Sequence, residues 1–363
     1  MKIAQVASLI ERIPPTLYGG AERVASYLTE ELVHFGHHVT LFASAQSVTT
    51  ARLMPCCAEP LRLNPAVRDV IPYYMIMVDK VRRMACEFDI IHFHFDQFHF
   101  PVFRDHAHRT LTTLHGRQDL PDLQMLYVAF PEMPLVSISH SQRAPIHNAN
   151  LVGTVYHGLP LDSLMPTLEP LGGYLAFLGR ISPEKGIDRA IEIARAVNLP
   201  LKIAAKIDRL DENYYRTEIA PKLAPGRVEY IGEIGELAKA KFLGEALALL
   251  FPIDWPEPFG LVMIEAMACG TPVLAFDAGA VREIIDEGIT GKVVRTVAEA
   301  IAALSEVLAL DRVRVRRRFE QRFSAHRMAM DYIRIYERMC RGANFPRALL
   351  AQSNEEKFSL PAK

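Results

Sequence analysis

Short apolar runs alternate with longer stretches of helical spacing along most of the chain. The first run, residues 2–8 ("KIAQVAS"), is followed by a loop, by residues 21–36 with apolar positions at helical spacing, and by a second apolar run at 37–44. Nearly continuous apolar runs are typical of strands that are buried on both faces of a parallel sheet. The pattern therefore predicts a strand, a helix and a strand, which form one βαβ unit.

The alternation continues in two blocks, which are separated by a segment rich in Pro and Gly at residues 156–173. Two such blocks predict two doubly wound α/β domains, residues 1–165 and 170–323, with ligands bound in the cleft beyond the carboxyl ends of the strands. The further predicted strands lie at residues 88–95, 109–115, 134–140, 174–180, 200–207, 227–232, 248–253 and 271–276, and the further predicted helices at 186–197, 236–246 and 259–269.

The end of the chain has a different pattern. Residues 312–340 carry Met, Ile and Tyr at helical spacing and predict one or two amphipathic helices. The arginines at 312–318 could indicate a patch for nucleic acid or anionic lipid, but a solvated helix face is the favoured interpretation because the chain is nearly neutral. We expect residues 346–363 to form a loosely ordered tail.

Composition narrows the class of protein. The 363 residues are 50% hydrophobic and 23% charged, with a formal net charge of −1. These values are typical of a globular protein and give no reason to expect nucleic acid as the main partner. Among the five cysteines only Cys56 and Cys57 are close together, which matches neither a zinc site nor a disulfide framework and favours a reducing, cytoplasmic location. The apolar runs are too short for a membrane span or a signal peptide, while peripheral contact with a membrane stays open.

Two glutamates stand out in residues 255–272, "WPEPFGLVMIEAMACGTP". A helix that begins near Phe259 would direct the unpaired N–H groups of Phe259, Gly260 and Leu261 into the cleft, with Glu257 in the preceding loop and Glu265 within the helix. Carboxylates and backbone donors together suit a ligand with many hydroxyl groups, such as a ribose or another sugar. The residues alone support a structural alternative equally well, in which a basic neighbour caps Glu265 and Glu257 is merely exposed.

Basic residues follow two strands of the second predicted domain. Arg180 and Lys185 come after the strand at 174–180 and offer a planar fork and a point charge for two phosphate groups. Lys206 follows a neighbouring strand and could reach a phosphate or a base, or simply pair with Asp208. The same edge of the sheet is therefore predicted to bind a diphosphate.

Glycines follow the first strand of the chain. Gly19 and Gly20 would allow the backbone to approach a ligand closely, and their N–H groups open a helix. Their spacing is not the G-x-G-x-x-G pattern of dinucleotide-binding proteins, which weakens a dehydrogenase interpretation.

A metal site is not predicted. His92 and His94 would share one face of a strand, with His99 nearby, but no carboxylate or cysteine completes a convincing set of ligands. No D-x-D segment is present that would hold a divalent metal against a diphosphate.

Several segments follow one another in an order that belongs to a known enzyme family. They are "YGGAE" (18–22), "FDIIHFH" (88–94), "TLHG" (113–116), "GRISPEKG" (179–186), "EPFGLVMIEAMACGTPV" (257–273) and "FSAHRMAMDYIRIYERM" (323–339). The pair Glu257 and Glu265 resembles the E-x7-E motif of the retaining glycosyltransferases of family 4, also called group 1, and the other segments resemble further motifs of that family. The resemblance extends over nearly the whole chain.

The resemblance implies the GT-B fold, in which two Rossmann-like domains face each other across a cleft. It implies a C-terminal helix, at about residues 324–345, that crosses back to the first domain. It also implies a front-face substitution, in which the leaving phosphate takes the proton of the acceptor. Closure of the domains about residues 156–173 would then assemble the site.

The resemblance further implies roles for individual residues. His115 would contact the donor sugar. Glu265 would bind the ribose, and Arg180 and Lys185 would bind the diphosphate. Glu257 and the amides of residues 259–261 would hold sugar hydroxyls. His157 departs from the family, since many relatives carry Asn there, which puts the details of the interdomain turn in doubt.

The expected co-substrate is a nucleotide sugar, and no tightly bound cofactor is expected. UDP is the most frequent nucleotide in the family and glucose the most frequent sugar, with GDP-mannose as the alternative. The acceptor is unidentified: a sugar, a lipid-linked molecule or another small molecule. The basic positions of the first domain (Arg62, Arg68, Lys80, Arg82 and Arg83) are interpreted as solvated charges rather than as a guide for a lipid.

Other functions share this architecture. A sugar-nucleotide epimerase or hydrolase would need no acceptor. A glycan phosphorylase with pyridoxal phosphate is disfavoured because no lysine motif for that cofactor is seen. A non-catalytic nucleotide-sugar-binding protein would keep the pocket without turnover.

Overall fold

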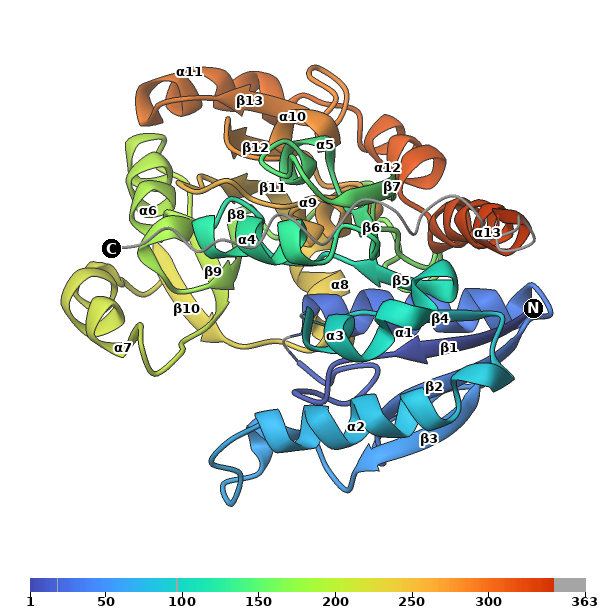
Figure 1. Ribbon diagram of the computed structural model, residues 1–363. Coiled ribbons are helices and arrows are strands. Elements are labelled where there is room, and N and C mark those ends of the chain that lie inside the picture. Colours follow the sequence, from blue (N-terminus) through green and yellow to red (C-terminus); the bar gives the residue numbers. More distant parts are fainter. Residues whose placement is uncertain (18, 96, 343–363) are drawn as a thin grey trace.

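Two parallel β-sheets follow each other along the chain, and each has helices on both faces (Figure 1). The computed structural model describes residues 1–17, 19–95 and 97–342. Within this part of the chain, no helix is both long enough and apolar enough to span a bilayer.

The N-terminal sheet has seven strands in the order β3-β2-β1-β4-β5-β6-β7. Its strands are β1 (Lys2–Val6), β2 (His38–Ser44), β3 (Arg52–Cys57), β4 (Ile90–Phe93), β5 (Thr110–Thr113), β6 (Pro134–Ser137) and β7 (Asn150–Thr154). The helices of this region are α1 (Gly20–His34), α2 (Ile71–Arg83), α3 (Phe100–Phe103), α4 (Pro121–Ala129) and α5 (His140–Arg143). The strand order reverses between β1 and β4, so the loops that follow these strands diverge and leave a crevice.

The C-terminal sheet has six strands in the order β10-β9-β8-β11-β12-β13. Its strands are β8 (Tyr174–Arg180), β9 (Leu201–Lys206), β10 (Val228–Gly232), β11 (Ala246–Phe251), β12 (Val273–Phe276) and β13 (Gly291–Val294). The remaining helices are α6 (Ile187–Ala196), α7 (Glu212–Tyr214), α8 (Glu236–Gly244), α9 (Leu261–Ala268), α10 (Val281–Ile284), α11 (Val297–Leu308), α12 (Arg312–Arg322) and α13 (Ala325–Gly342). The order reverses here between β8 and β11, which gives this sheet its own crevice.

The predicted architecture of two doubly wound α/β domains is confirmed, and every predicted strand is present. Three strands were not predicted: β3, β7 and β13. Each lies at an edge of its sheet, and β3 and β7 are largely half-buried, so they lack the continuous apolar run that marks a central strand.

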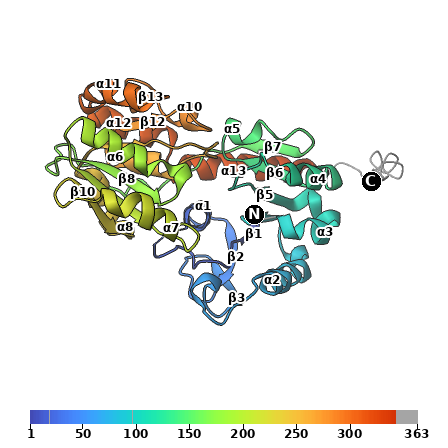
Figure 2. The ribbon, with the colours of Figure 1, turned by 90° about the vertical axis from the view of Figure 1, so that its left-hand side faces the viewer.

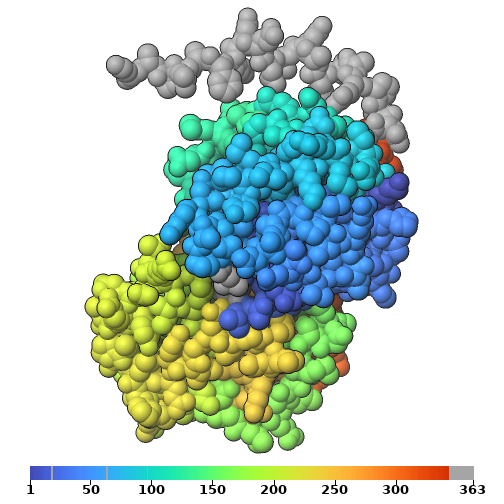
Figure 3. All heavy atoms as spheres, turned by 90° about the horizontal axis from the view of Figure 1, so that it is seen from below, coloured from blue at the N-terminus to red at the C-terminus, as the bar shows by residue number. Residues whose placement is uncertain are grey.

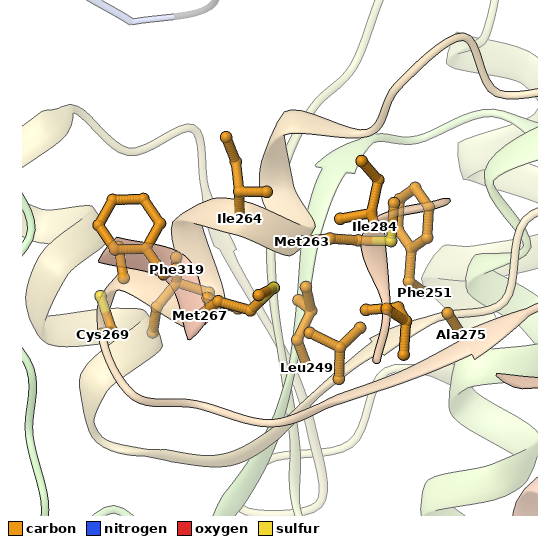
Figure 4. Close-up of a cluster of buried hydrophobic side chains, with 14 of the residues drawn as sticks. Leu249, Phe251, Met263, Ile264, Met267, Cys269, Ala275, Ile284 and Phe319 are labelled. Atoms are coloured by element: carbon orange, nitrogen blue, oxygen red, sulfur yellow. The ribbon is translucent and has the colours of Figure 1, made fainter. Parts of the chain in front are cut away.

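Helix α9 is packed into the core of the C-terminal domain. Its buried side chains include Met263, Ile264 and Met267, which lie against β11 and against Phe319 of α12 (Figure 4). This packing holds the start of α9 rigidly at the carboxyl end of the sheet.

The chain crosses between the domains twice, at adjacent places. The amide of Leu159 donates to Phe323 (2.9 Å), and the carbonyl of Leu159 accepts from Ala325 (2.8 Å). A Cβ atom on Gly158 would lie 2.2 Å from the carbonyl oxygen of Ser324, so only glycine fits this close approach. Helix α13 then returns to the N-terminal domain, where it packs against α1 (Figure 2). The predicted tail at 346–363 lies outside the described residues.

The prediction that the arginines at 312–318 lie on a solvated helix face is wrong for two of them. Arg312 and Arg316 are buried and donate to backbone carbonyls, among them Thr167 and Leu164 of the interdomain segment. Arg317, by contrast, is exposed. The run therefore holds the segment between the domains against α12.

Candidate active site in the interdomain cleft

A cavity of about 570 Å³ lies between the two domains, at the carboxyl ends of both sheets. Viewed from below, the domains form two lobes, blue to teal and green to gold (Figure 3). All the site residues predicted from the sequence line this cavity: Gly19, Gly20, His115, Arg180, Lys185, Lys206, Glu257, Phe259, Gly260, Leu261 and Glu265. The structure thus brings together residues from distant parts of the chain, while their individual roles stay predictions.

Two helices begin at the cavity, one from each domain. A Cβ atom on Gly20, the first residue of α1, would lie 3.1 Å from Cδ1 of Leu261, the first residue of α9. The unpaired N–H groups at the starts of both helices are therefore close together. Because both macrodipoles place their positive ends here, the cavity favours an anionic ligand.

Helix α9 begins two residues later than predicted. Gly260 is its N-cap, with φ at 85°, a conformation that L side chains rarely adopt. A Cβ atom at this position would also lie 2.6 Å from Cε of Met263. The left-handed turn at Gly260 ends the loop before the helix, so Phe259 precedes the helix and Leu261 opens it.

Lys185 and Glu257 form an ion pair inside the cavity. The Lys185 Nζ lies 2.6 Å from Oε2 of Glu257, and Nε1 of Trp255 donates to the same oxygen over 2.9 Å. The ammonium also lies 4.4 Å from the centroid of the Trp255 ring, within the range of a cation–π interaction. Glu257 is therefore held in place and is not merely exposed, which excludes that part of the structural alternative.

Arg180 and Lys206 converge on one carboxylate. Asp208 lies 3.7 Å from Arg180 and 2.5 Å from Lys206, measured between charged atoms. Arg180 also pairs with Glu184 and lies 3.5 Å from Asp211. Of the alternatives for Lys206, the pair with Asp208 is present, and contact with a phosphate or a base stays a prediction. The two cations are close enough to share an anionic ligand.

Glu265 is paired with a buried lysine. The Nζ of Lys239, on α8, lies 2.6 Å from Oε1 of Glu265, and the two side chains are only 10% and 5% exposed. This is the basic neighbour that the structural alternative expected. Both residues line the cavity, so the pair can also face a ligand.

His115 is half-buried and lies beside two buried imidazoles, those of His94 and His157. Its Nε2 lies 3.2 Å from Nδ1 of His94, and its ring stacks on that of His157 at 5.4 Å between centroids. Burial lowers the pKa of His115 from 6.5 to about 4, and burial also lowers the pKa values of His92, His94 and His157 well below 6.5. These imidazoles are therefore neutral at pH 7.

This cluster predicts how stability depends on pH. Between pH 6.5 and about 4 the unfolded chain binds protons at these histidines and the native protein does not, so stability falls as the pH falls through this window. We expect the free energy of unfolding to drop by up to about 1.4 kcal/mol per pH unit for each histidine. Urea unfolding at pH 7, 6 and 5 measures this slope. It should become shallower in His157→Asn but not in His147→Gln, an exposed control, and equal slopes in all three proteins would contradict the prediction.

Sequence reasoning missed three contributors to the cavity: Lys239, Trp255 and the pair of Glu11 with Arg62. A signal existed for Lys239, because it shares a helix face with the apolar Phe242 and Leu243, where a lysine needs a partner. No local pattern marks the pair of Glu11 and Arg62. Arg62 is exposed, as predicted for a solvated charge, and also pairs with Glu11.

The contacts of the histidines explain their burial without a metal. His92 bonds to Tyr336 and Thr113, and His99 to Thr112. Among the residues that the structure describes, no group of three or more His, Cys, Asp or Glu side chains is placed to hold a metal ion.

Known proteins resemble both halves of the chain. Residues 172–324 match the family "Glycosyl transferases group 1" and residues 18–150 match "Glycosyltransferase Family 4". The phosphatidyl-myo-inositol mannosyltransferase of Mycobacterium leprae is 30% identical over 203 residues, 50% of this chain and 52% of its own length. The alpha-maltose-1-phosphate synthase of Mycobacterium tuberculosis is 27% identical over 231 residues, 54% of this chain and 59% of its own length. The chain thus spans about half the length of the curated relatives it matches.

Solved structures resemble nearly the whole chain. Sucrose-phosphate synthase from Thermosynechococcus elongatus superimposes with a TM-score of 0.76 at 20% identity, over 94% of this chain and 99% of that one. A glycosyltransferase involved in avilamycin A biosynthesis superimposes with a TM-score of 0.67 at 21% identity, over 94% of this chain and 98% of that one. An Anabaena protein, HepE, in complex with UDP and glucose superimposes with a TM-score of 0.70 at 16% identity, over 93% of this chain and 100% of that one. These similarities confirm the predicted GT-B fold.

Both family matches fall on the two sheets and on the segments that line the cavity. The chain belongs to the family 4, or group 1, glycosyltransferases.

Proposed function

We propose that this protein is a retaining glycosyltransferase that moves a hexose from a nucleotide sugar to an acceptor. The observation that carries the proposal is the single cavity that holds Arg180, Lys185, Glu257 and Glu265 beside two helix N-termini. Cations and backbone donors suit the diphosphate, and carboxylates suit the hydroxyl groups of the ribose and the sugar.

The donor would lie mainly on the C-terminal domain. Glu265, which is paired with Lys239, would accept hydrogen bonds from the ribose hydroxyls. Glu257 and the amides of residues 259–261 would bind the sugar. Arg180 and Lys185 would exchange part of their contact with carboxylates for contact with the diphosphate. Their present ion pairs keep both cations in place before the donor binds.

Four further predicted residues complete this arrangement. Lys206 would add a cation near the phosphates or the base. Gly19 and Gly20 would bring the start of α1 to the donor from the opposite domain, and His115 would meet the sugar.

In the reaction, the bond between C1 of the sugar and the diphosphate oxygen breaks, and a bond between C1 and the acceptor oxygen forms on the same face. The acceptor proton passes to the leaving phosphate oxygen. The protein contributes position and positive charge, through Lys185, Arg180 and the two helix N-termini. No metal and no tightly bound cofactor has a part in this proposal.

UDP and glucose are the proposed nucleotide and sugar. The Anabaena protein of the same fold is solved with UDP and glucose, which supports this choice. The relative from Mycobacterium leprae is a phosphatidyl-myo-inositol mannosyltransferase. GDP-mannose as donor and a lipid-linked acceptor are therefore the main alternatives. We place the reaction in the cytoplasm, with peripheral membrane contact left open.

Two rival functions make different predictions. An epimerase or hydrolase of this fold would consume the donor without an acceptor. A non-catalytic protein would bind the donor without turnover, but the intact set of Arg180, Lys185, Glu257 and Glu265 in the cavity argues against it.

Thermal stabilisation tests the proposed donor. UDP-, GDP- and ADP-sugars are added in turn to the wild type, and we expect one nucleotide class to raise Tm, because a ligand that binds only the native state stabilises it. The rise should be lost in Arg180→Ala and Glu265→Ala. No rise with any of the three, or an equal rise in both variants, would contradict the proposed binding mode.

A further inference from the structure

A chain of hydrogen bonds connects His115, at the cavity, to helix α13, which packs on one face of the N-terminal sheet. From His115 it continues through His94, whose Nε2 lies 2.7 Å from Oε1 of Gln5 on β1. The side-chain amide of Gln5 donates in turn to the hydroxyl of Tyr336 on α13, over 3.2 Å. Gln5, His94 and Tyr336 are all buried, so water does not substitute for these partners.

The Tyr336 hydroxyl is fixed by a second histidine. It lies 2.7 Å from Nδ1 of His92, whose Nε2 lies 2.7 Å from Oγ1 of Thr113. The hydroxyl of Tyr332, one turn earlier on α13, lies 2.8 Å from the same Thr113 oxygen. Both tyrosines of α13 are thus built into the polar network beneath the cavity.

The network determines where each proton lies. The imidazoles are neutral, because burial lowers their pKa values, so each has one N–H group and one bare nitrogen. Because Oε1 of Gln5 can only accept, the proton of His94 must be on Nε2, and its Nδ1 is bare. The Nε2 of His115 must then donate to that Nδ1, which leaves Nδ1 of His115 without a proton.

The bare nitrogen has no partner within the described protein. The Nδ1 of His115 is shielded from solvent and makes no hydrogen bond, although His115 lines the cavity. A buried acceptor without a donor costs free energy unless a ligand satisfies it. A sugar hydroxyl would supply the missing donor.

We infer that Gln5, held by Tyr336 of α13, is a positioning residue that fixes the tautomer of His115 and so makes its Nδ1 an acceptor for a hydroxyl of the substrate. The substrate part of this inference rests on the proposed function, and the tautomer part does not. The C-terminal helix thereby takes part in the site without touching the ligand.

The tautomer is measured directly by nitrogen NMR of histidine-labelled protein without ligand, with His115→Gln to assign the signals. In the wild type we expect His115 to have a protonated Nε2 and a bare Nδ1. The opposite orientation of the Gln5 amide would reverse every donor in the chain and place the proton on Nδ1. That result in the wild type would overturn the inference, whether or not any variant folds.

Two variants test the role of Gln5. Gln5→Met removes the acceptor opposite His94 at similar volume, and we expect His115 to become a mixture of both tautomers. Gln5→Glu keeps an oxygen opposite His94 and is expected to retain the wild-type tautomer. An unchanged tautomer in folded Gln5→Met would also overturn the inference. Tyr336→Phe, which frees the Gln5 amide to turn, provides a second variant if Gln5→Met does not fold.

A kinetic measurement separates this inference from the proposed function. With UDP-glucose as donor, we expect the kcat of Gln5→Met to fall about tenfold. The Kd for UDP should stay unchanged, because the nucleotide would be held by the other domain. If no nucleotide binds even the wild type, the proposed function fails while the tautomer result still stands. A normal kcat in a variant with mixed tautomers would overturn the functional part alone.

Discussion

Replacing Lys185 by methionine is expected to lower the rate of sugar transfer by about a hundred- to a thousand-fold, the usual effect of removing one preorganised group that stabilises developing charge. In the proposed transfer the leaving diphosphate gains negative charge as the bond to the sugar breaks. Glu257 and the ring of Trp255 hold Lys185 in the cavity, where it would meet this charge. The side chain of methionine fills similar volume but carries no charge. Steady-state kinetics with a saturating donor measures the loss in kcat.

A matched control separates this effect from a general loss of charge. Lys292 forms an exposed ion pair with Glu306 at 3.1 Å, and neither residue lines the cavity. Lys292→Met should leave the rate unchanged, because Lys292 does not line the cavity. The variant should also fold, because exposed ion pairs contribute little to stability. A folded Lys185→Met protein that keeps its rate within about threefold would contradict the role of Lys185 in charge stabilisation.

The second large effect concerns stability. Arg312→Met is expected to lower the free energy of unfolding by about 3–5 kcal/mol, because it leaves several buried acceptors without a donor. Arg312 donates to the carbonyls of Thr167 (2.7 Å), Gly244 (2.8 Å) and Ala246 (2.9 Å) and to the hydroxyl of Thr271 (2.6 Å). Methionine can make none of these bonds. Urea unfolding at pH 7 measures the difference.

Arg317 on the same helix is the control for this prediction. Its side chain is exposed, and Arg317→Met should change the free energy of unfolding by no more than about 0.5 kcal/mol. A loss below about 1 kcal/mol in Arg312→Met would mean that the buried carbonyls find other partners, such as water.

The parallel sheets could be predicted from the sequence because a central strand has a local signature. The apolar runs of β1, β8 and β11 mark strands that are covered on both faces, whatever lies next to them. Edge strands such as β3 have half-exposed side chains and no such run. Their existence depends on the neighbouring strand, which no local window contains.

The lining of the cavity could also be predicted in part, because many of its residues follow the carboxyl ends of parallel strands. The partners of those residues could not. Lys185 and Glu257 are 72 positions apart, and their contact depends on how two loops of the folded domain meet.

The buried arginines are an intermediate case. Arg312 and Arg316 share a helix face with Val315 and Phe319, so the spacing indicated burial, whereas the charge alone suggested solvent.

The proposed transfer is tested most directly by the release of nucleoside diphosphate from UDP-glucose and GDP-mannose, with and without an extract of small metabolites and lipids. We expect release by the wild type from one donor only, dependent on the extract, and a loss of release in Lys185→Met. Equal consumption of the donor without the extract would identify a hydrolase or an epimerase. Binding of a donor with no release under any condition would contradict transfer and favour a non-catalytic binding protein.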